Sequence, residues 1–283
     1  MRTIIVAAIA ASLACALPAT AAEPTLARVK QSGVLKLGYR ENSIPFSFVA
    51  VGSKPRGYSI DLCQIVANDV AKQLNMPNLE VRWVAVTAQS RFETLKSGAI
   101  DLECGNSTQT LSRRADFDFS VMTFVDGASL LFRKGEKPST LEQIKGQRVV
   151  VVSGTTTEKT LERMTDADSL GIKLIKVDDH NTALKMLKER AATAYAADRT
   201  VLVAAALASG EGQSFELSDN QFTYEPYGLM MRRDAEFRLV VDRSLSRIYR
   251  NGDVGAILKR WFEPLGDPGD VLRTMFLLNG LPE

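Results

Sequence analysis

Two segments of this chain repeat the same order of strands and helices, and this repetition constrains the fold more than any other feature. In the first segment, residues 34–38, 80–84 and 99–102 form the short apolar runs that are typical of strands. Helices are expected between them at residues 59–74, where apolar side chains recur every four positions, and at residues 89–97. Strands that alternate with helices indicate a parallel sheet covered by helices.

The second segment begins with a continuous apolar run at residues 149–152, as expected for a central strand of a parallel sheet. A turn rich in threonine leads into the next helix. The alternation then continues through a helix at residues 158–164, a strand at 172–177, a helix at 182–189 and a strand at 192–196. Two segments of one topology predict an α/β fold with two similar lobes.

The lobes are predicted to be joined by two crossover segments, at residues 124–134 and 224–232. Helices expected at residues 235–249 and 253–262 follow the second crossover and can return to the first lobe. Because open parallel sheets bind ligands at the carboxyl ends of their strands, the ligand cleft is expected between the lobes. The predicted division is residues 1–22 as signal peptide, 23–125 as the first part of lobe 1, 126–226 as lobe 2 and 227–283 as the second part of lobe 1.

The N-terminus has the features of a secretory signal peptide. Arg2 supplies a positive charge, residues 4–17 form an apolar core, and Ala19-Thr20-Ala21 is a small-x-small cleavage site. Because the apolar run is too short to remain as a bilayer-spanning anchor, we expect an exported, periplasmic protein. The chain carries 35 basic and 33 acidic residues, and this balance gives no support to binding of nucleic acid or of anionic membranes.

Cleavage of the leader removes Cys15 and leaves Cys63 and Cys104. An oxidising compartment permits a disulfide, but the sequence does not place the two sulfur atoms within bonding distance. Cys63 is expected on a buried helix face and Cys104 at a strand end, where free cysteine often packs as a small apolar side chain. We therefore predict two free thiols, with a disulfide as the alternative. With one histidine and no clustered ligands, neither a metal nor a cofactor is expected.

The strongest candidate for a binding site is Glu103-Cys104-Gly105-Asn106-Ser107-Thr108, followed by Arg113. Here a short apolar strand runs into a small polar loop, and an arginine follows within reach. Backbone N–H groups and a hydroxyl in the loop can meet one oxygen of a carboxylate, and a guanidinium fork can meet both. The stretch therefore predicts a carboxylate-binding clamp.

Other polar residues occur where predicted strands end and helices begin. Helix N-termini favour anions because they present free N–H groups and a positive partial charge. The residues are Arg40, Arg91, Thr155, Thr156, His180 and Asp198. Asp198 is the candidate counter-ion for a bound ammonium, so the whole set fits a zwitterion with an additional anionic group.

Each candidate also has a plainer interpretation. Arg113 can be a solvated surface charge, and the threonines can simply cap a helix. His180 can form only local hydrogen bonds, and Asp198 can pair with Arg199 at the surface. Arg40 and Arg91 are weaker still as isolated signals, so sequence spacing alone leaves these alternatives open.

An ordered set of stretches also carries a family resemblance. The stretches are Gly38-Tyr39-Arg40-Glu41-Asn42-Ser43-Ile44-Pro45-Phe46-Ser47-Phe48, Gln89-Ser90-Arg91, Glu103-Cys104-Gly105, residues 150–156, Asp179-His180, residues 228–234 and residues 257–262. In these stretches the chain resembles the glutamate/aspartate-binding proteins of polar amino-acid ABC importers, which have the type II bilobal fold of periplasmic solute-binding proteins. The resemblance covers nearly all of the mature chain.

The resemblance implies a role for each candidate. The residues implied for the α-carboxylate of the ligand are Arg113, Thr108, Thr155 and Thr156. Asp198 is implied to bind the α-ammonium, and the amide oxygen of Asn106 can be a further acceptor. The residues implied around the distal carboxylate of L-glutamate or L-aspartate are Arg40, Arg91 and His180.

The chain departs from the pattern of the family at two positions. Ala88 and Asn106 stand where serine is expected in the closest relatives. Ala88 removes a hydroxyl near the distal group of the ligand. The preference among aspartate, glutamate and glutamine is therefore left open.

The function that these observations predict is a soluble periplasmic receptor, expected to be a monomer, that binds an acidic L-amino acid by lobe closure. It would deliver the ligand to an ABC transporter permease in the inner membrane, and ATP would be hydrolysed by a separate subunit because this chain has no Gly-x-x-x-x-Gly-Lys loop. One alternative is a secreted dehydratase or lyase on the same fold, which needs an acid or base in the cleft. Glu41, Glu103 and His180 are its nominal candidates. The other alternative is a ligand-sensing module for a membrane sensor.

Overall fold

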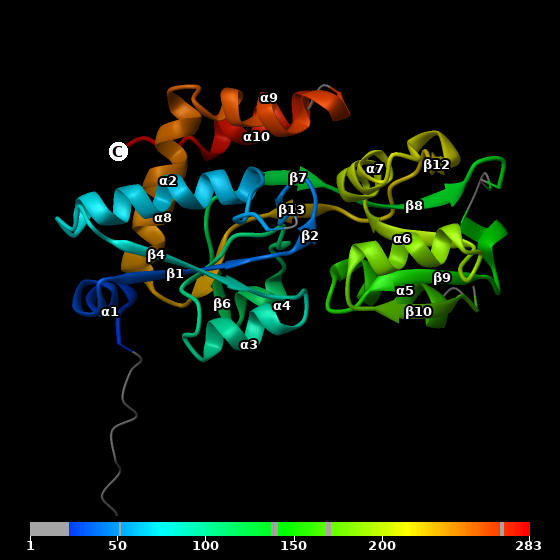
Figure 1. The fold of residues 1–283 in the computed structure, drawn as a ribbon, viewed down its shortest axis with the longest axis horizontal. Helices are drawn as coiled ribbons and strands as arrows, with labels where there is room; N and C mark the ends of the chain where they lie inside the picture. The colour runs from blue at the N-terminus through cyan, green and yellow to red at the C-terminus, as the bar shows by residue number, and fades with distance from the viewer. Residues whose placement is uncertain (1–22, 51, 137, 139–140, 168–170, 267–268) are drawn as a thin grey trace, which may run out of the picture.

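The computed structural model describes residues 23–50, 52–136, 138, 141–167, 171–266 and 269–283. The signal peptide predicted at residues 1–22 lies outside them. Figure 1 shows two α/β bodies that are linked near the middle of the molecule. Each body contains a five-stranded sheet. Within the described ranges, no helix has both the length and the apolar character needed to cross a bilayer.

The first sheet has the strand order β4–β1–β5–β14–β6. Its first three strands are parallel, whereas β14 runs antiparallel to both of its neighbours. The strands are β1 (Val34–Tyr39), β4 (Glu80–Ala85), β5 (Leu102–Glu103), β6 (Phe117–Phe119) and β14 (Met230–Arg232). Because β14 comes from far along the chain, this sheet is built from two separate parts of the sequence. A short hairpin, β2 (Asn42–Ser43) with β3 (Ser47–Phe48), follows β1.

Helices from both parts of the sequence surround this sheet, and the last two of them pack on its helices and on β7 (Phe124–Asp126) (Figure 1). They are α1 (Thr25–Ser32), α2 (Tyr58–Gln73), α3 (Ser90–Lys96), α4 (Leu111–Arg114), α8 (Ala235–Arg250), α9 (Val254–Phe262) and α10 (Gly269–Asn279), with a 3₁₀ turn at Glu263–Leu265. The apolar repeat predicted for the long helix forms the buried face of α2, where Leu62, Val66 and Val70 are fully buried. This face joins one apolar cluster with side chains from β1, α8, α9 and α10.

The second sheet has the strand order β10–β9–β11–β8–β12. Its strands are β8 (Ala128–Arg133), β9 (Arg148–Val152), β10 (Lys173–Val177), β11 (Ala194–Asp198) and β12 (Phe215–Leu217). Its helices are α5 (Thr156–Ala167), α6 (His180–Lys188) and α7 (Arg199–Ala208), with 3₁₀ turns at Leu141–Ile144 and Gly212–Ser214. Alternate valines of β9 enter clusters on opposite faces of the sheet, Val150 on one and Val149 and Val151 on the other. Burial on both faces accounts for the continuous apolar run in the sequence.

Two short strands connect the bodies. They are β7 (Phe124–Asp126) and β13 (Glu225–Tyr227), which pair antiparallel and place Glu225 opposite Asp126. In Figure 1 this ribbon lies between the two bodies. The chain thus passes twice between the sheets at adjacent places, which is the arrangement that two crossover segments require.

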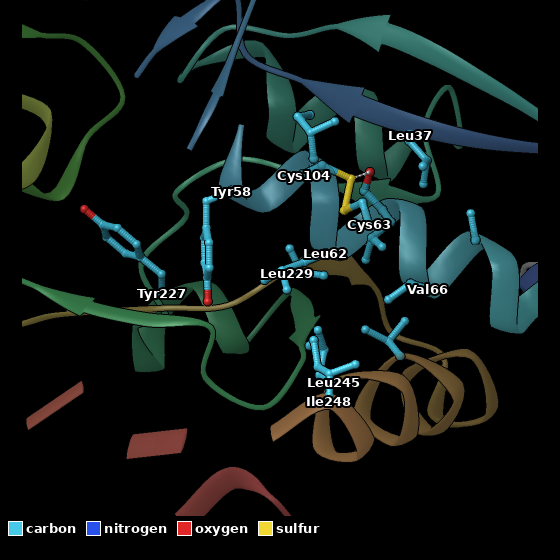
Figure 2. Packing of buried hydrophobic residues seen from close by; sticks show 14 of the residues in the cluster. Leu37, Tyr58, Leu62, Cys63, Val66, Cys104, Tyr227, Leu229, Leu245 and Ile248 are labelled. Atoms are coloured by element: carbon cyan, nitrogen blue, oxygen red, sulfur yellow. Dashed lines mark hydrogen bonds between the residues drawn. A yellow bond between two sulfur atoms is a disulfide. The ribbon is translucent and has the colours of Figure 1, made fainter. Parts of the chain in front are cut away.

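The prediction of two free thiols is wrong, because Cys63 and Cys104 form a disulfide. Figure 2 shows the bond inside the apolar cluster, between α2 and the chain segment that leaves β5. Their Cα atoms are 6.1 Å apart, a common separation for a disulfide. Both predicted positions were right, but packing of α2 on the sheet brings the two sulfurs together. The sequence alone does not show this pairing.

Loss of this disulfide is expected to lower the free energy of unfolding by about 2–5 kcal/mol, because the bond closes a long loop in the unfolded chain. The measurement is chemical denaturation of the wild type and of a Cys63→Ala/Cys104→Ala variant, each with and without reductant. Reductant should destabilise only the wild type. Equal stability of the oxidised wild type and the variant would contradict the expectation.

Candidate functional site

All nine predicted site residues line one cavity between the two bodies. The cavity encloses about 380 Å³, counting its opening to solvent. The other lining residues are Val152, Thr157, Ala196 and Ala197. The residues converge because the carboxyl ends of β1 and β5 in one sheet and of β9 and β11 in the other reach the same gap, as open α/β sheets commonly arrange.

The Asn106 loop is fixed from three directions. Cys104 is held by the disulfide, and the Ser107 hydroxyl donates to the buried Glu103 carboxylate over 2.7 Å. The backbone N–H of Gln109 then donates to the carbonyl of Pro226 in β13 over 2.7 Å. Within this rigid loop, Asn106 Oδ1 is buried and has no hydrogen-bond partner among the described residues. A buried amide oxygen of this kind is available to a ligand donor.

Three arginines enter the cavity from the first body: Arg40 after β1, Arg91 in α3 and Arg113 in α4. Only 3%, 3% and 8% of their respective surfaces are exposed, which excludes a solvated surface charge for Arg113. Burial, reinforced by the charge of Arg91, lowers the pKa of Arg40 to about 10 and that of Arg113 to about 9, so both stay charged at neutral pH.

These arginines lack protein counter-ions at contact distance. Among the described residues, none of the three forms an ion pair within 4 Å. Arg91 and Arg113 each donate instead to the carbonyl of Gly154 over 3.4 Å, and Arg113 also donates to the carbonyl of Thr108 over 2.8 Å. Because buried charges normally carry a partner, the cavity is suited to an anionic ligand.

The N-terminus of α5 faces the cavity from the second body. The Thr155 hydroxyl donates to the carbonyl of Val152 over 2.7 Å and accepts from the N–H of Glu158 over 3.1 Å. The capping interpretation is therefore correct for the Thr155 side chain. The remaining N–H groups of the first turn have no intrahelical acceptor, as at any helix start, and lie where an anion can use them.

Asp198 does not form the surface ion pair that the sequence allows. It accepts from the Tyr227 hydroxyl over 2.5 Å and from the Thr157 hydroxyl over 3.3 Å, whereas Arg199 donates to the carbonyl of Ser218 over 2.9 Å. Burial raises the pKa of Asp198 to about 8, and the nearby charges of Glu225 and Asp126 act in the same direction. The carboxyl thus lies in a negative environment that favours a bound cation.

His180 begins α6, but Asp179 caps that helix, since its carboxylate accepts from the N–H of Thr182 over 2.9 Å. The His180 ring pairs through Nδ1 with the Tyr195 hydroxyl at 2.5 Å. Burial, together with the charge of Arg40, lowers the pKa of His180 to about 3, so the ring is neutral at physiological pH. When Nδ1 accepts from the phenol, Nε2 carries the hydrogen and is a donor.

Sequence reasoning missed several residues that shape the site, namely Gly154, Thr157, Glu225 and Tyr227. The sequence contained one sign of Glu225, namely a carboxylate within the predicted second crossover segment at residues 224–232. Only the fold shows that this carboxylate is 1% exposed and faces two cavity residues.

A family model for bacterial extracellular solute-binding proteins, family 3, matches residues 35–264. The chain belongs to this family. A Pseudomonas aeruginosa protein named L-glutamate/L-aspartate-binding protein is 35% identical over 264 residues, which are 92% of this chain and 87% of that protein. A glutamate/aspartate import solute-binding protein of Salmonella typhimurium is 32% identical over 87% of this chain and 82% of its own length.

Solved structures show the same fold. The cysteine-binding protein of Campylobacter jejuni superposes with a TM-score of 0.76 over 87% of this chain and 96% of its own, at 22% identity. The two-lobed fold of extracellular binding proteins predicted from the sequence is therefore confirmed. The family and these relatives are binding proteins, which favours a receptor over the enzyme alternative.

Proposed function

We propose that this protein is a periplasmic receptor for an acidic L-amino acid, L-glutamate or L-aspartate, that feeds an ABC importer. The observation that carries the proposal is the group of three buried arginines that form no ion pair among the described residues and share one cavity with Asp198 and the unpartnered amide oxygen of Asn106. Two carboxylates and one ammonium complement this division of charge. The names of the two relatives identify the same ligands.

The ligand is oriented by the two ends of the cavity. Arg113 and the free N–H groups at the start of α5 bind the α-carboxylate, while Asp198 and Asn106 accept from the α-ammonium. Arg40, Arg91 and the neutral His180 surround the distal carboxylate. A ligand held in this way contacts both bodies and therefore binds the closed form more tightly than the open form. This difference in affinity shifts the protein towards the closed form.

The bodies correspond to lobes that close around the crossover strands. We place the first lobe at residues 23–125 and 227–283 and the second at 126–226, after removal of a signal peptide. The closed, monomeric receptor docks on a permease in the inner membrane. Two of the nominal catalytic candidates are held by neighbouring side chains, since Glu103 accepts from the Ser107 hydroxyl and His180 pairs with the Tyr195 hydroxyl, and this supports a receptor over an enzyme.

Isothermal titration tests this function. L-Glutamate and L-aspartate should bind at one site per chain, and L-lysine should not bind, because its distal ammonium would face Arg40 and Arg91. Binding should also release protons at pH 7. The pKa of Asp198 is about 8 before binding, so its carboxyl is mostly protonated and must ionise to accept from the ammonium.

The release of a proton fixes the direction in which ligand affinity changes with pH. Affinity should rise as the pH increases towards 8 and then level off, because the cost of ionising Asp198 disappears. Titrations in buffers of different ionisation enthalpy measure the released protons, and Asp198→Asn serves as the control without release. Binding of L-lysine in place of both acidic amino acids would reject the proposed ligand class.

A further inference from the structure

Glu225 lies directly behind the cavity. It is not among the cavity-lining residues, yet its Oε2 atom accepts from the Thr108 hydroxyl over 2.5 Å and from the Thr156 hydroxyl over 2.6 Å. Both threonines line the cavity. Thr108 comes from the loop after β5 and Thr156 from the start of α5, so one carboxylate of the crossover strand joins the two bodies.

These two hydrogen bonds determine what the threonines can offer a ligand. A hydroxyl has one hydrogen and two lone pairs. The carboxylate takes the hydrogen of each threonine, although the two hydroxyl oxygens lie only 3.3 Å apart and could otherwise bond to each other. Both hydroxyls therefore present only lone pairs, so they can accept from a ligand but cannot donate to it.

We propose that Glu225 is a positioning residue that orients the Thr108 and Thr156 hydroxyls as acceptors for the α-ammonium of the ligand. The inference rests on the proposed amino-acid function. The family resemblance assigns Thr108 to the α-carboxylate, whereas the oriented Thr108 hydroxyl can only accept and is therefore assigned to the ammonium. Arg113 and the backbone N–H groups of α5 remain the donors for the α-carboxylate.

The surrounding charges support this orientation. Glu225 lies opposite Asp126 in the pairing of β13 with β7, and the charges of both residues act on Asp198. Three carboxyl groups therefore lie close together near the two hydroxyls, which favours a cationic group of the ligand at this place. An ammonium has three hydrogens to donate. Asp198, the Asn106 amide and the two oriented hydroxyls provide enough acceptors for all of them.

The arrangement also couples ligand recognition to closure. Thr108 is fixed to β13 by the bridge between its backbone and Tyr227, whereas Thr156 belongs to the other body. Only when the bodies come together can both hydroxyls reach one carboxylate oxygen. The complete acceptor set for the ammonium therefore exists only in the closed form.

The test compares L-glutamate with its α-hydroxy analogue, which keeps both carboxylates but lacks the ammonium. Glu225→Met removes the acceptor and frees both hydroxyl hydrogens. Its affinity for L-glutamate should fall at least about tenfold, since hydrogen bonds to a charged group are involved, and its affinity for the analogue should not fall. Glu225→Gln keeps an acceptor oxygen and should stay close to the wild type. Thermal unfolding of each variant checks that it is folded.

A double-mutant cycle separates orientation from a general structural effect. In a Thr108→Val/Thr156→Val background, Glu225→Met should cause little further loss of L-glutamate affinity, because the hydroxyls that it orients are gone. Equal loss for both ligands, additive loss in that background, or a Glu225→Gln variant as weak as Glu225→Met would each overturn the proposal. A wild type that binds neither L-glutamate nor L-aspartate would instead reject the proposed function itself.

Discussion

Arg113→Ala is expected to weaken the binding of every α-amino acid by at least about 30-fold. The residue is only 8% exposed, and its guanidinium donates to carbonyls on both sides of the cavity, those of Thr108 and Gly154. Removal leaves the α-carboxylate of the ligand buried without its charged partner. Truncation of one partner of a buried charge pair costs about 2–5 kcal/mol, which is roughly a 30-fold to several-thousand-fold loss of affinity.

Arg91→Ala should have a narrower effect, because Arg91 is assigned to the distal carboxylate. It should weaken L-glutamate and L-aspartate while leaving weak binding of neutral amino acids unchanged. The matched control is Arg114→Ala, which removes an exposed arginine next to Arg113. Titration of each variant with an acidic and a neutral amino acid separates these effects. Normal binding by Arg113→Ala would show that the α-carboxylate is held elsewhere.

The sequence predicts the architecture well because the architecture depends on local apolar patterns. The run of valines in β9 and the four-residue spacing of apolar side chains in α2 each correspond to side chains that are buried against neighbouring elements. Most of the nine site residues were predicted by position at strand ends and helix starts, which share one edge in an open α/β fold, whereas the prediction of Arg40 and Arg91 depended on the family resemblance. Local position therefore carried most of the information about the cavity.

The missed features all depend on contacts between distant segments. Cys63 and Cys104 meet only because α2 packs over the end of β5. The two strands of the crossover ribbon were predicted as connecting segments, since strands of three residues leave almost no pattern. The strand expected at residues 99–102 begins only at Leu102, because Asp101 turns its carboxylate back to accept from the N–H of Lys36 over 2.9 Å.

Charge state was a further quantity that sequence position did not reveal. His180 and Asp198 were both expected to meet charged groups of the ligand. Burial makes the histidine neutral and raises the pKa of the aspartic acid to about 8. The site thus contains three arginines that are charged at neutral pH and an aspartic acid that is mostly protonated, whose ionisation the proposed binding of an ammonium would favour.

The proposed closure requires the two bodies to approach closely at Gly154, in the turn between β9 and α5. This residue has a φ of +78°, and a Cβ atom there would lie 2.9 Å from the carbonyl oxygen of Ala88 and 3.0 Å from Cα of Gln89. The contacted atoms belong to the backbone of the other body and cannot rotate away as a side chain can. A methyl group at this position therefore holds the bodies apart.

Gly154→Ala is accordingly expected to weaken L-glutamate binding at least about tenfold, because the carbonyl of Gly154 and the start of α5 no longer reach Arg91 and Arg113. The left-handed backbone adds a strain of about 1–2 kcal/mol that any alanine at such a φ would carry. Gly146→Ala is the matched control, since Gly146 has a φ of +71° and no atom lies within 4 Å of the place that its added methyl group would take. Both variants should lose similar thermal stability, but only Gly154→Ala should lose affinity and fail to become more compact with ligand in small-angle X-ray scattering. Equal affinities in the two variants would show that closure does not require this contact. The two bodies would then meet at another part of the cavity rim.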